Sequence, residues 1–179
     1  MEQEIVEMYE NQKQSDNECL VIDDREIFIR IYSDLRRFAA VVGDSDMDPD
    51  DLVQDALVRV ISKNALSDLD NPKVYLKRTI TNLCSNKRRR FGVWKGLQPR
   101  VSESSHYEDF YPSDLAVLEA LMPVDRAVIY LADVEGLAHK DIAVMLDLAE
   151  STVRKKVSRA RLKLREVLSV EEINFKGEK

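Results

Sequence analysis

The chain has 179 residues, of which 44% are hydrophobic and 34% charged, enough for one ordinary domain or two small ones. Glycine and proline are scarce, with five of each, and this composition favours helices over sheets. The N-terminal sequence MEQEIVEMYE lacks the basic and apolar segments of a secretory signal, and no apolar run approaches the roughly eighteen residues that span a bilayer. These features predict a cytoplasmic protein with no membrane insertion.

The net charge of −6 conceals an uneven distribution of charge. Residues 72–95 hold eight Lys or Arg and no Asp or Glu, and residues 151–165 hold seven and none. The rest of the chain therefore holds all 33 acidic residues. A phosphate backbone is attracted by local fields rather than by net charge, so these two basic segments predict a polyanionic partner.

The first half of the chain begins with an acidic stretch, residues 1–24, which we interpret as a solvated tail with a candidate short helix at Ile5–Tyr9. A helix is then predicted by an apolar stripe at helical spacing: Ile27, Phe28, Ile31, Leu35 and Phe38. A turn at 43–49 leads into the next helix, for which Asp48 is the expected N-cap and Pro49 the first residue.

A polar loop is expected at 62–71, after which Pro72 opens a long helix that ends in the basic run at 87–90. Glycine, proline and serine return in residues 91–112, and this composition is typical of a linker. The helical pattern resumes at Asp114, with one short helix around 115–121 and another that starts at Pro123.

The second half continues with a break at Glu135-Gly136, a short helical pattern at His139–Leu146, a tight turn and a basic helix at 150–168. The basic helix has one apolar seam, made of Val153, Val157, Ala160, Leu164 and Leu168. A helix, a turn and a basic helix in this order form a DNA-reading arrangement.

The predicted fold class is therefore all-α, with two small helical domains joined by a linker and a helix-turn-helix in the C-terminal one. The expected boundaries are an acidic tail at 1–24, a first domain at 25–92, a linker at 93–113, a second domain at 114–170 and a C-terminal tail at 171–179.

Two groups of motifs resemble those of the extracytoplasmic-function sigma factors, group IV of the sigma-70 family. In the first half, the similar segments are 50–55 (DDLVQD), 75–83 (YLKRTITNL) and 86–90 (NKRRR). In the second half, they are 121–126 (LMPVDR), 135–137 (EGL), 141–143 (DIA), 151–154 (STVR) and 158–165 (SRARLKLR). The two groups occur in the family's order, with a short linker and no middle domain.

The resemblance implies a sigma factor that binds core RNA polymerase and directs promoter recognition, DNA melting and transcription initiation at a specific promoter set. The implied partners are promoter DNA and core polymerase, through the coiled coil of its largest subunit and its flap. An anti-sigma factor is the family's usual means of control and is a further candidate partner.

For polymerase, the resemblance implies a contact surface on the helix that follows Pro49. The candidate residues are Asp51, Leu52, Gln54, Asp55 and Val58. Helical spacing turns Leu52 and Ala56 inward, while Asp51, Gln54 and Asp55 can face outward to meet arginines of the partner.

For the minus-10 element, the resemblance implies the helix at 72–90, with a pocket for unstacked bases formed partly by the loop at 63–71. The candidate DNA-binding residues are Lys77, Arg78, Asn82, Asn86, Arg88 and Arg89. Asn86 departs from the family, in which Asp is commoner. We interpret Tyr75 as a core residue rather than a base-stacking one.

For the minus-35 element, the resemblance implies insertion of the basic helix into the major groove by its N-terminal turns. The candidate residues are Ser151, Thr152, Arg154, Lys155, Ser158 and Arg159. Two departures from the family affect this region: Asp147 stands where glycine is usual in the turn, and Ala149 replaces the usual capping serine. Ser151 is a candidate for a shifted cap.

No catalytic triad, P-loop or dinucleotide fingerprint is visible, and neither the histidines (His106, His139) nor the cysteines (Cys19, Cys84) have metal-ligand spacing. The sequence thus predicts no enzymatic activity, no cofactor and no metal. Two alternatives are a stand-alone helix-turn-helix regulator and a sigma-like interaction module that does not read promoters. The motif at 50–55 and the basic helix at 72–90 argue against the first, and intact basic faces on both helices argue against the second.

Overall fold

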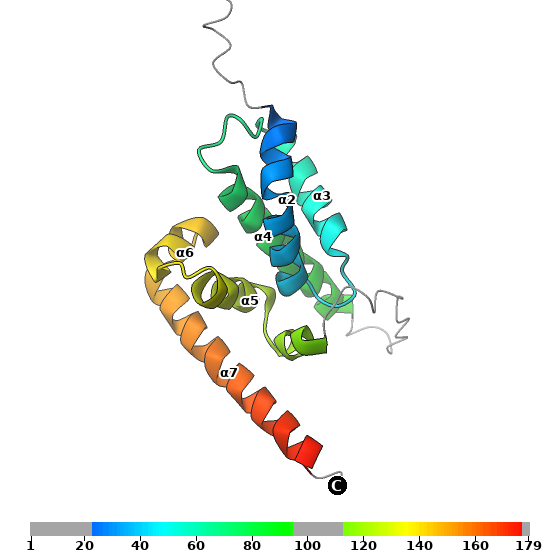
Figure 1. Cartoon of the computed structure of the whole chain (residues 1–179), viewed down its shortest axis with the longest axis vertical. Helices are drawn as coiled ribbons and strands as arrows, with labels where there is room; N and C mark the ends of the chain where they lie inside the picture. Colours follow the sequence, from blue (N-terminus) through cyan, green and yellow to red (C-terminus); the bar gives the residue numbers. More distant parts are fainter. Residues whose placement is uncertain (1–22, 95–112, 177–179) are drawn as a thin grey trace, which may run out of the picture.

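The computed structural model describes residues 23–94 and 113–176, and every regular element in these two ranges is helical, which confirms the all-α prediction (Figure 1). The first range contains α2 (Asp24–Val42), α3 (Pro49–Ile61) and α4 (Pro72–Trp94). The second contains the 3-10 helix η1 (Ser113–Ala120), α5 (Pro123–Ile129), the π-helical turn η2 (Tyr130–Val134), α6 (His139–Leu146) and α7 (Glu150–Lys176). The predictions for the N-terminal tail, including Ile5–Tyr9, and for residues 95–112 of the linker lie outside the described residues.

Several helices begin where capping chemistry predicts. The Asp48 carboxylate accepts a hydrogen bond from the Asp50 amide at 2.7 Å, and Pro49 is the first residue of α3. Pro72 likewise begins α4. A proline fits this position because the first helical amide has no partner within the helix.

In the first half, α2, α3 and α4 pack against one another in a three-helix bundle. Apolar side chains from all three helices meet in its interior and are fully buried: Leu35, Phe38, Leu52, Ala56, Leu76 and Ile80. The amphipathic stripe read from the sequence of α2 thus faces this interior at its C-terminal end.

The connection between α3 and α4 is fastened to the start of α2. The Asp24 carboxylate accepts hydrogen bonds from the amides of Leu66 and Ser67, each at 2.9 Å, and these two bonds lower the pKa of Asp24. Leu66 is only 1% exposed, although the sequence suggested a polar loop here. The loop is therefore anchored by one buried side chain and two backbone hydrogen bonds.

In the second half, α5 and α6 both pack on α7, and α6 and α7 form the predicted helix-turn-helix. The turn depends on Asp147, which adopts a left-handed conformation with φ 57° and ψ 52°. Asp tolerates this region of φ/ψ space better than most residues do, but less well than glycine. A second positive φ occurs in the break before α6, at Gly136, with φ 68°.

The two halves are in contact and share one hydrophobic core. Helix α5 packs against α2 and α4 as well as α7, and α6 also packs against α4. In Figure 1, α5 accordingly lies between α7 and the first bundle. At the junction, the rings of Phe38 and Tyr130 meet edge to face at 5.6 Å between centroids.

Three details differ from the sequence-based expectations. Helices α4 and α7 extend beyond residues 90 and 168, to Trp94 and Lys176. The segment around 115–121 forms a 3-10 helix rather than an α-helix. Tyr75, interpreted as a core residue, is 48% exposed because it lies on the outer side of α4, so that interpretation is wrong.

Candidate nucleic-acid interface

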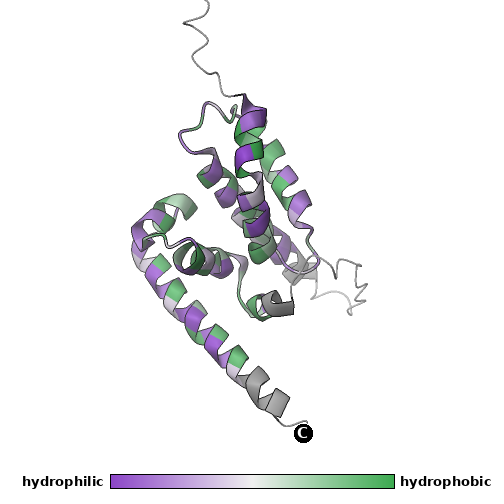
Figure 2. Cartoon of the chain, viewed as in Figure 1, coloured by the Kyte–Doolittle hydropathy of each residue, from purple (hydrophilic) through white to green (hydrophobic). Residues whose placement is uncertain are grey.

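The first turns of α7 present a polar, cationic surface. Ser151, Arg154, Lys155, Ser158 and Arg159 are all exposed, and Thr152 is half-buried. On the opposite side, three small apolar side chains hold the helix against its neighbours: Val153 (0% exposed), Val157 (2%) and Ala160 (2%). Hydrophilic and hydrophobic residues consequently alternate in bands along α7 in Figure 2. The predicted seam is confirmed in its N-terminal part, but Leu168 at its far end is 50% exposed.

The start of α7 has no shifted serine cap. The Ala149 carbonyl accepts hydrogen bonds from the amides of Thr152 (2.9 Å) and Val153 (3.1 Å), so Ala149 holds the capping position. The helix begins at Glu150, which places Ser151 inside the first turn. The suggestion that Ser151 caps the helix is therefore wrong.

Among the cations in the first turns of α7 that form an ion pair, Arg154 is the most exposed. It contacts Glu150 at 2.8 Å, and its side chain is 68% exposed. Such an i,i+4 pair on a helix surface contributes only about 0.3–0.5 kcal/mol, so the guanidinium can exchange Glu150 for a stronger acceptor.

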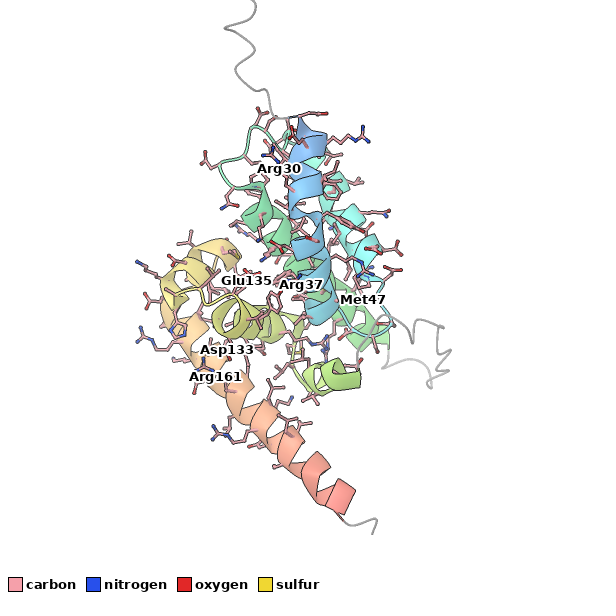
Figure 3. The ribbon with its side chains drawn as sticks, viewed as in Figure 1. Arg30, Arg37, Met47, Asp133, Glu135 and Arg161 are labelled. Atoms are coloured by element: carbon pink, nitrogen blue, oxygen red, sulfur yellow. The ribbon has the colours of Figure 1, made fainter. Side chains whose placement is uncertain are left out.

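Basic residues elsewhere on α7 serve a different purpose. Lys156 contacts Asp125 of α5 at 2.7 Å. Arg161 contacts Asp133 of η2 at 2.5 Å, and these two side chains are labelled in Figure 3. The hydrogen bond to Asp133 raises the pKa of Arg161. Lys163 donates to the carbonyl of Ala120. These cations fasten α7 to the elements beneath it, a role that a count of charges in the sequence could not distinguish from DNA binding.

On α4, Lys77 is not available to DNA in this structure. Its side chain is fully buried and forms an ion pair with Glu135, which belongs to the second half of the chain. The ammonium group also lies 5.2 Å from the Phe38 ring centroid and 6.0 Å from that of Tyr130. Desolvation lowers the pKa of Lys77, and the Glu135 hydrogen bond opposes that shift.

Two further cations of α4 also contact the second half. Arg78 pairs with Asp147, in the turn before α7, at 2.5 Å. Arg88 donates to the Leu121 carbonyl at 2.8 Å and lies 3.3 Å from Asp44. The remaining candidates for the minus-10 contact are exposed: Asn82, Asn86 and Arg89. The structure therefore splits the six predicted residues into three that are engaged between the halves and three that are accessible.

The helix α3 presents the face that the motif at 50–55 predicted. Asp51, Gln54 and Asp55 are exposed, and Val58 is 61% exposed on the same helix. Leu52 is completely buried, which matches its expected inward orientation but means that it supports this face instead of touching a partner. Its place among the candidate contact residues is corrected accordingly.

The first residue of the same motif has an internal role. The Asp50 carboxylate accepts hydrogen bonds from the Tyr32 hydroxyl at 2.6 Å and from Arg36 Nε at 2.8 Å, both on α2. The bond to Asp50 raises the pKa of Tyr32. Asp50 thereby fixes α3 against α2 and positions the exposed face of α3.

The sequence reasoning missed Arg126, which is fully buried on α5. Its Nε donates to the carbonyls of Leu118 (2.8 Å) and Leu121 (3.3 Å) in its own half. Its terminal nitrogens reach the first half, where they contact Asp44 Oδ1 at 2.6 Å and the carbonyls of the 42–43 turn. The available signal was a lone arginine inside the apolar stretch 124–131.

Within residues 23–94 and 113–176, no cluster of three or more His, Cys, Asp or Glu side chains could hold a metal ion. No helix in the same part of the chain has the length and apolar character needed to cross a membrane. Cys84 is a buried free thiol, and burial raises its pKa to about 12.

Comparison with known proteins assigns both halves of the chain. Residues 27–92 match the sigma-70 region 2 family, and residues 115–164 match the sigma-70 region 4 family. The chain is 31% identical over 157 residues to the ECF RNA polymerase sigma factor SigM of Mycobacterium tuberculosis, with 80% of this chain and 76% of the relative covered. It is 28% identical over 152 residues to the ECF sigma factor SigE of Mycolicibacterium smegmatis, with 78% and 58% covered.

One solved structure is similar across both halves. The sigma factor RpoE of Bartonella quintana, determined in complex with the anti-sigma factor NepR, superposes with a TM-score of 0.61 and 26% identity. The superposition covers 82% of this chain and 96% of the other, a share that neither half of this chain could supply alone.

Proposed function

This chain belongs to the extracytoplasmic-function sigma factors of the sigma-70 family, and from that premise we propose how its helices divide the work of transcription initiation. As a sigma factor, it binds core RNA polymerase and directs it to promoter DNA. The domain boundaries that we assign to this work are 25–92 for region 2 and 114–170 for region 4.

The minus-35 element is assigned to the first turns of α7. The observation that supports this proposal is that the basic residues of α7 have two different roles. Arg154, Lys155 and Arg159 are exposed. The more distal Arg161 and Lys163 form polar contacts with Asp133 and with the Ala120 carbonyl. Major-groove readers contact base edges with the N-terminal residues of the recognition helix. Arg154 and Arg159 lie about one turn and about two and a half turns from the helix start, where a bidentate contact to guanine is in reach.

The polymerase contact is assigned to the exposed face of α3. Asp51, Gln54, Asp55 and Val58 combine two carboxylates, an amide and an apolar side chain on one surface. Carboxylates at the rim set the encounter rate and orientation, and the exposed valine adds buried apolar area on binding. The partner we infer is the coiled coil of the largest polymerase subunit.

The minus-10 element is assigned to α4, through Asn82, Asn86 and Arg89 together with Lys77, Arg78 and Arg88 once these leave their present partners. Tyr75 joins this surface, because an exposed aromatic ring next to cationic side chains is suited to stacking on an unpaired base. We further propose that the protein has no catalytic activity of its own, acts in the cytoplasm at the nucleoid, and is subject to an anti-sigma factor.

The experiment that tests this assignment is transcription reconstituted from core polymerase and the purified protein, with start sites mapped on fragmented genomic DNA. We expect initiation at a limited set of promoters that share sequence near positions −35 and −10. Output that does not depend on promoter sequence, or no output above that of core polymerase alone, would contradict the proposal.

A further inference from the structure

The loop at 62–71, which joins α3 to α4, is tied to the start of α2 by a single carboxylate. Asp24 is the first residue of α2 and accepts hydrogen bonds from the amides of Leu66 and Ser67, each at 2.9 Å and each on a different carboxylate oxygen. Figure 1 accordingly shows the loop beside the N-terminal end of α2. The bonds connect residues 42 and 43 positions apart, so Asp24 acts on a segment that is remote from its own helix in sequence.

Other contacts hold the same loop from its inner side. Leu66 is 1% exposed, and Leu69 packs against the hydrophobic core. At the end of the loop, the Asn71 side chain accepts a hydrogen bond from the Val74 amide of α4 at 3.2 Å. The exposed side chains of the loop are all polar: Ser62, Lys63, Asn64, Ser67, Asp68, Asp70 and Asn71. The loop thus combines a held backbone with an exposed polar surface.

The loop leads directly to the exposed ring of Tyr75. The Tyr75 amide donates to the Asn71 carbonyl at 3.2 Å, so the last residue of the loop is bonded to the first turn of α4. Tyr75 is 48% exposed, and we assign its ring to stacking on an unpaired base. Hydrogen bonds to the edge of such a base are what distinguish it from the other bases. The polar loop that precedes Tyr75 is suited to supply them.

A loop that is ordered before DNA arrives favours discrimination between bases. Ordering a loop on binding costs conformational free energy, and loosely held groups adapt to a wrong base as well as to the right one. The bonds from Leu66 and Ser67 lower the pKa of Asp24, so the acceptor is ionised at neutral pH and both bonds are strengthened by its charge. Because Leu66 and Leu69 also hold the loop, loss of Asp24 should loosen its backbone and leave region 2 folded.

We propose that Asp24 is a positioning residue for recognition of the minus-10 element, because it holds the backbone at 66–67 so that the polar loop and Tyr75 form one pocket for an unstacked base before DNA binds. This rests on the proposed function of α4. Asp24 touches no base in this mechanism and acts only through the loop. Its place in the sequence, at the end of the acidic stretch 1–24, gave no sign of this role.

The test compares Asp24→Asn with Asp23→Asn, two neighbouring substitutions that remove the same charge. An asparagine side chain has one acceptor oxygen, and its NH2 group cannot accept the second amide, so Asp24→Asn disrupts the pair of bonds to the loop. The Asp23 carboxylate accepts from the Arg25 amide at 3.4 Å, a contact within the start of α2 that asparagine can also make. A difference between the variants therefore reports on the loop rather than on charge.

Two measurements are made on the full chain assembled with core polymerase. Fluorescence anisotropy gives the ratio of affinities for two single-stranded oligonucleotides, one carrying the minus-10 element of a promoter recovered by start-site mapping and one with the same bases scrambled. Mass spectrometry gives the rate of hydrogen exchange at 62–71. For Asp24→Asn we expect the ratio to fall and the exchange to accelerate, each at least about fivefold, and for Asp23→Asn both should stay within about twofold of the wild type.

An unchanged affinity ratio in Asp24→Asn would overturn the proposal, since a merely structural role lowers the affinity for both oligonucleotides alike. An equal fall in both variants would also overturn it, in favour of an effect of charge. If Asp24→Asn does not fold, as judged by circular dichroism, Asp24→Ser and Asp23→Ser replace the pair, because serine is well tolerated at the start of a helix.

The same measurements separate this proposal from the function on which it rests. A wild-type protein without preference for the minus-10 oligonucleotide would contradict the assignment of α4 and the role of Asp24 together. A wild-type preference that Asp24→Asn retains would contradict the role of Asp24 alone.

Discussion

The basic segments of α4 and α7 have similar charge in the sequence, yet the structure places their cations differently. On α7, Arg154, Lys155 and Arg159 are exposed within the first three turns. On α4, Lys77, Arg78 and Arg88 contact residues of the other half of the chain. A run of basic residues in the sequence thus indicates attraction for a polyanion. The packing of neighbouring helices decides which of these basic side chains are exposed and can contact the polyanion.

The largest expected effect comes from removing the cation that joins the halves. Arg126→Met should lower the free energy of unfolding by about 3 kcal/mol or more, because Asp44 and several carbonyl oxygens lose a buried partner. The measurement is urea denaturation. Arg161→Met, which breaks an exposed pair within region 4, is the control and should cost less than about 1 kcal/mol. Equal losses of unfolding free energy in the two variants would mean that the buried guanidinium of Arg126 stabilises the fold no more than an exposed one does.

The next largest effect concerns promoter recognition by the exposed cations of α7. Arg154→Ala should weaken discrimination of the minus-35 sequence by about 1–3 kcal/mol, or roughly one to two orders of magnitude, because a bidentate base contact is lost. Competition between promoter and mutated promoter in reconstituted transcription measures it. Arg165→Ala, further along the same exposed helix, should change discrimination little. A matching loss of affinity for core polymerase in Arg154→Ala would point to misfolding instead.

A smaller effect concerns α3. The double substitution Asp51→Asn with Asp55→Asn should slow association with core polymerase a few-fold at low salt, with the difference shrinking as salt increases, because rim charges act mainly on the encounter. Stopped-flow fluorescence measures the rate. Asp68→Asn with Asp70→Asn makes the same change of charge in the exposed loop before α4 and is the matched control. Identical slowing in both doubles would assign the effect to net charge.

The smallest effect tests the start of α7. Ala149→Ser should raise the free energy of unfolding by about 1 kcal/mol, because a serine hydroxyl at this position can accept a hydrogen bond from the unpaired amides of the first turn. Thermal denaturation measures it. Ser151→Ala should be neutral to within about 0.5 kcal/mol, since Ser151 is inside the helix. A destabilised Ser151→Ala would restore the shifted cap that the structure contradicts.

Local chemistry was sufficient to predict much of the fold. Asp48 with Pro49, Pro72 and the pattern at His139–Leu146 each give a helix boundary through interactions within a few residues, and the structure has these boundaries. The seam of Val153, Val157 and Ala160 was likewise readable from helical periodicity. The sequence also indicated the exposed face of α3 and the tight turn before the basic helix, in which Asp147 lies.

What could not be predicted depends on the contact between the halves. Arg126 and Lys77 are charged residues that become buried only because α5 packs against α2 and α4. No local sequence pattern predicts this packing between helices that are distant in sequence. Tyr75 was misplaced because an aromatic residue among apolar neighbours was assumed to follow them inward. The splitting of the basic set on α7 into exposed and fastened members similarly depends on Asp125 and Asp133, which are distant in sequence.

Asp147 combines two properties that a substitution cannot change separately. Its backbone has a left-handed conformation, which costs glycine less conformational energy, and its carboxylate pairs with Arg78 in the other half. A change to glycine would relax the turn and cut the link to region 2 at once. A substitution at this single position would therefore change both the stability of the helix-turn-helix and the contact between the two halves. Relatives that have glycine here should have a more stable turn and one ion pair fewer between the halves.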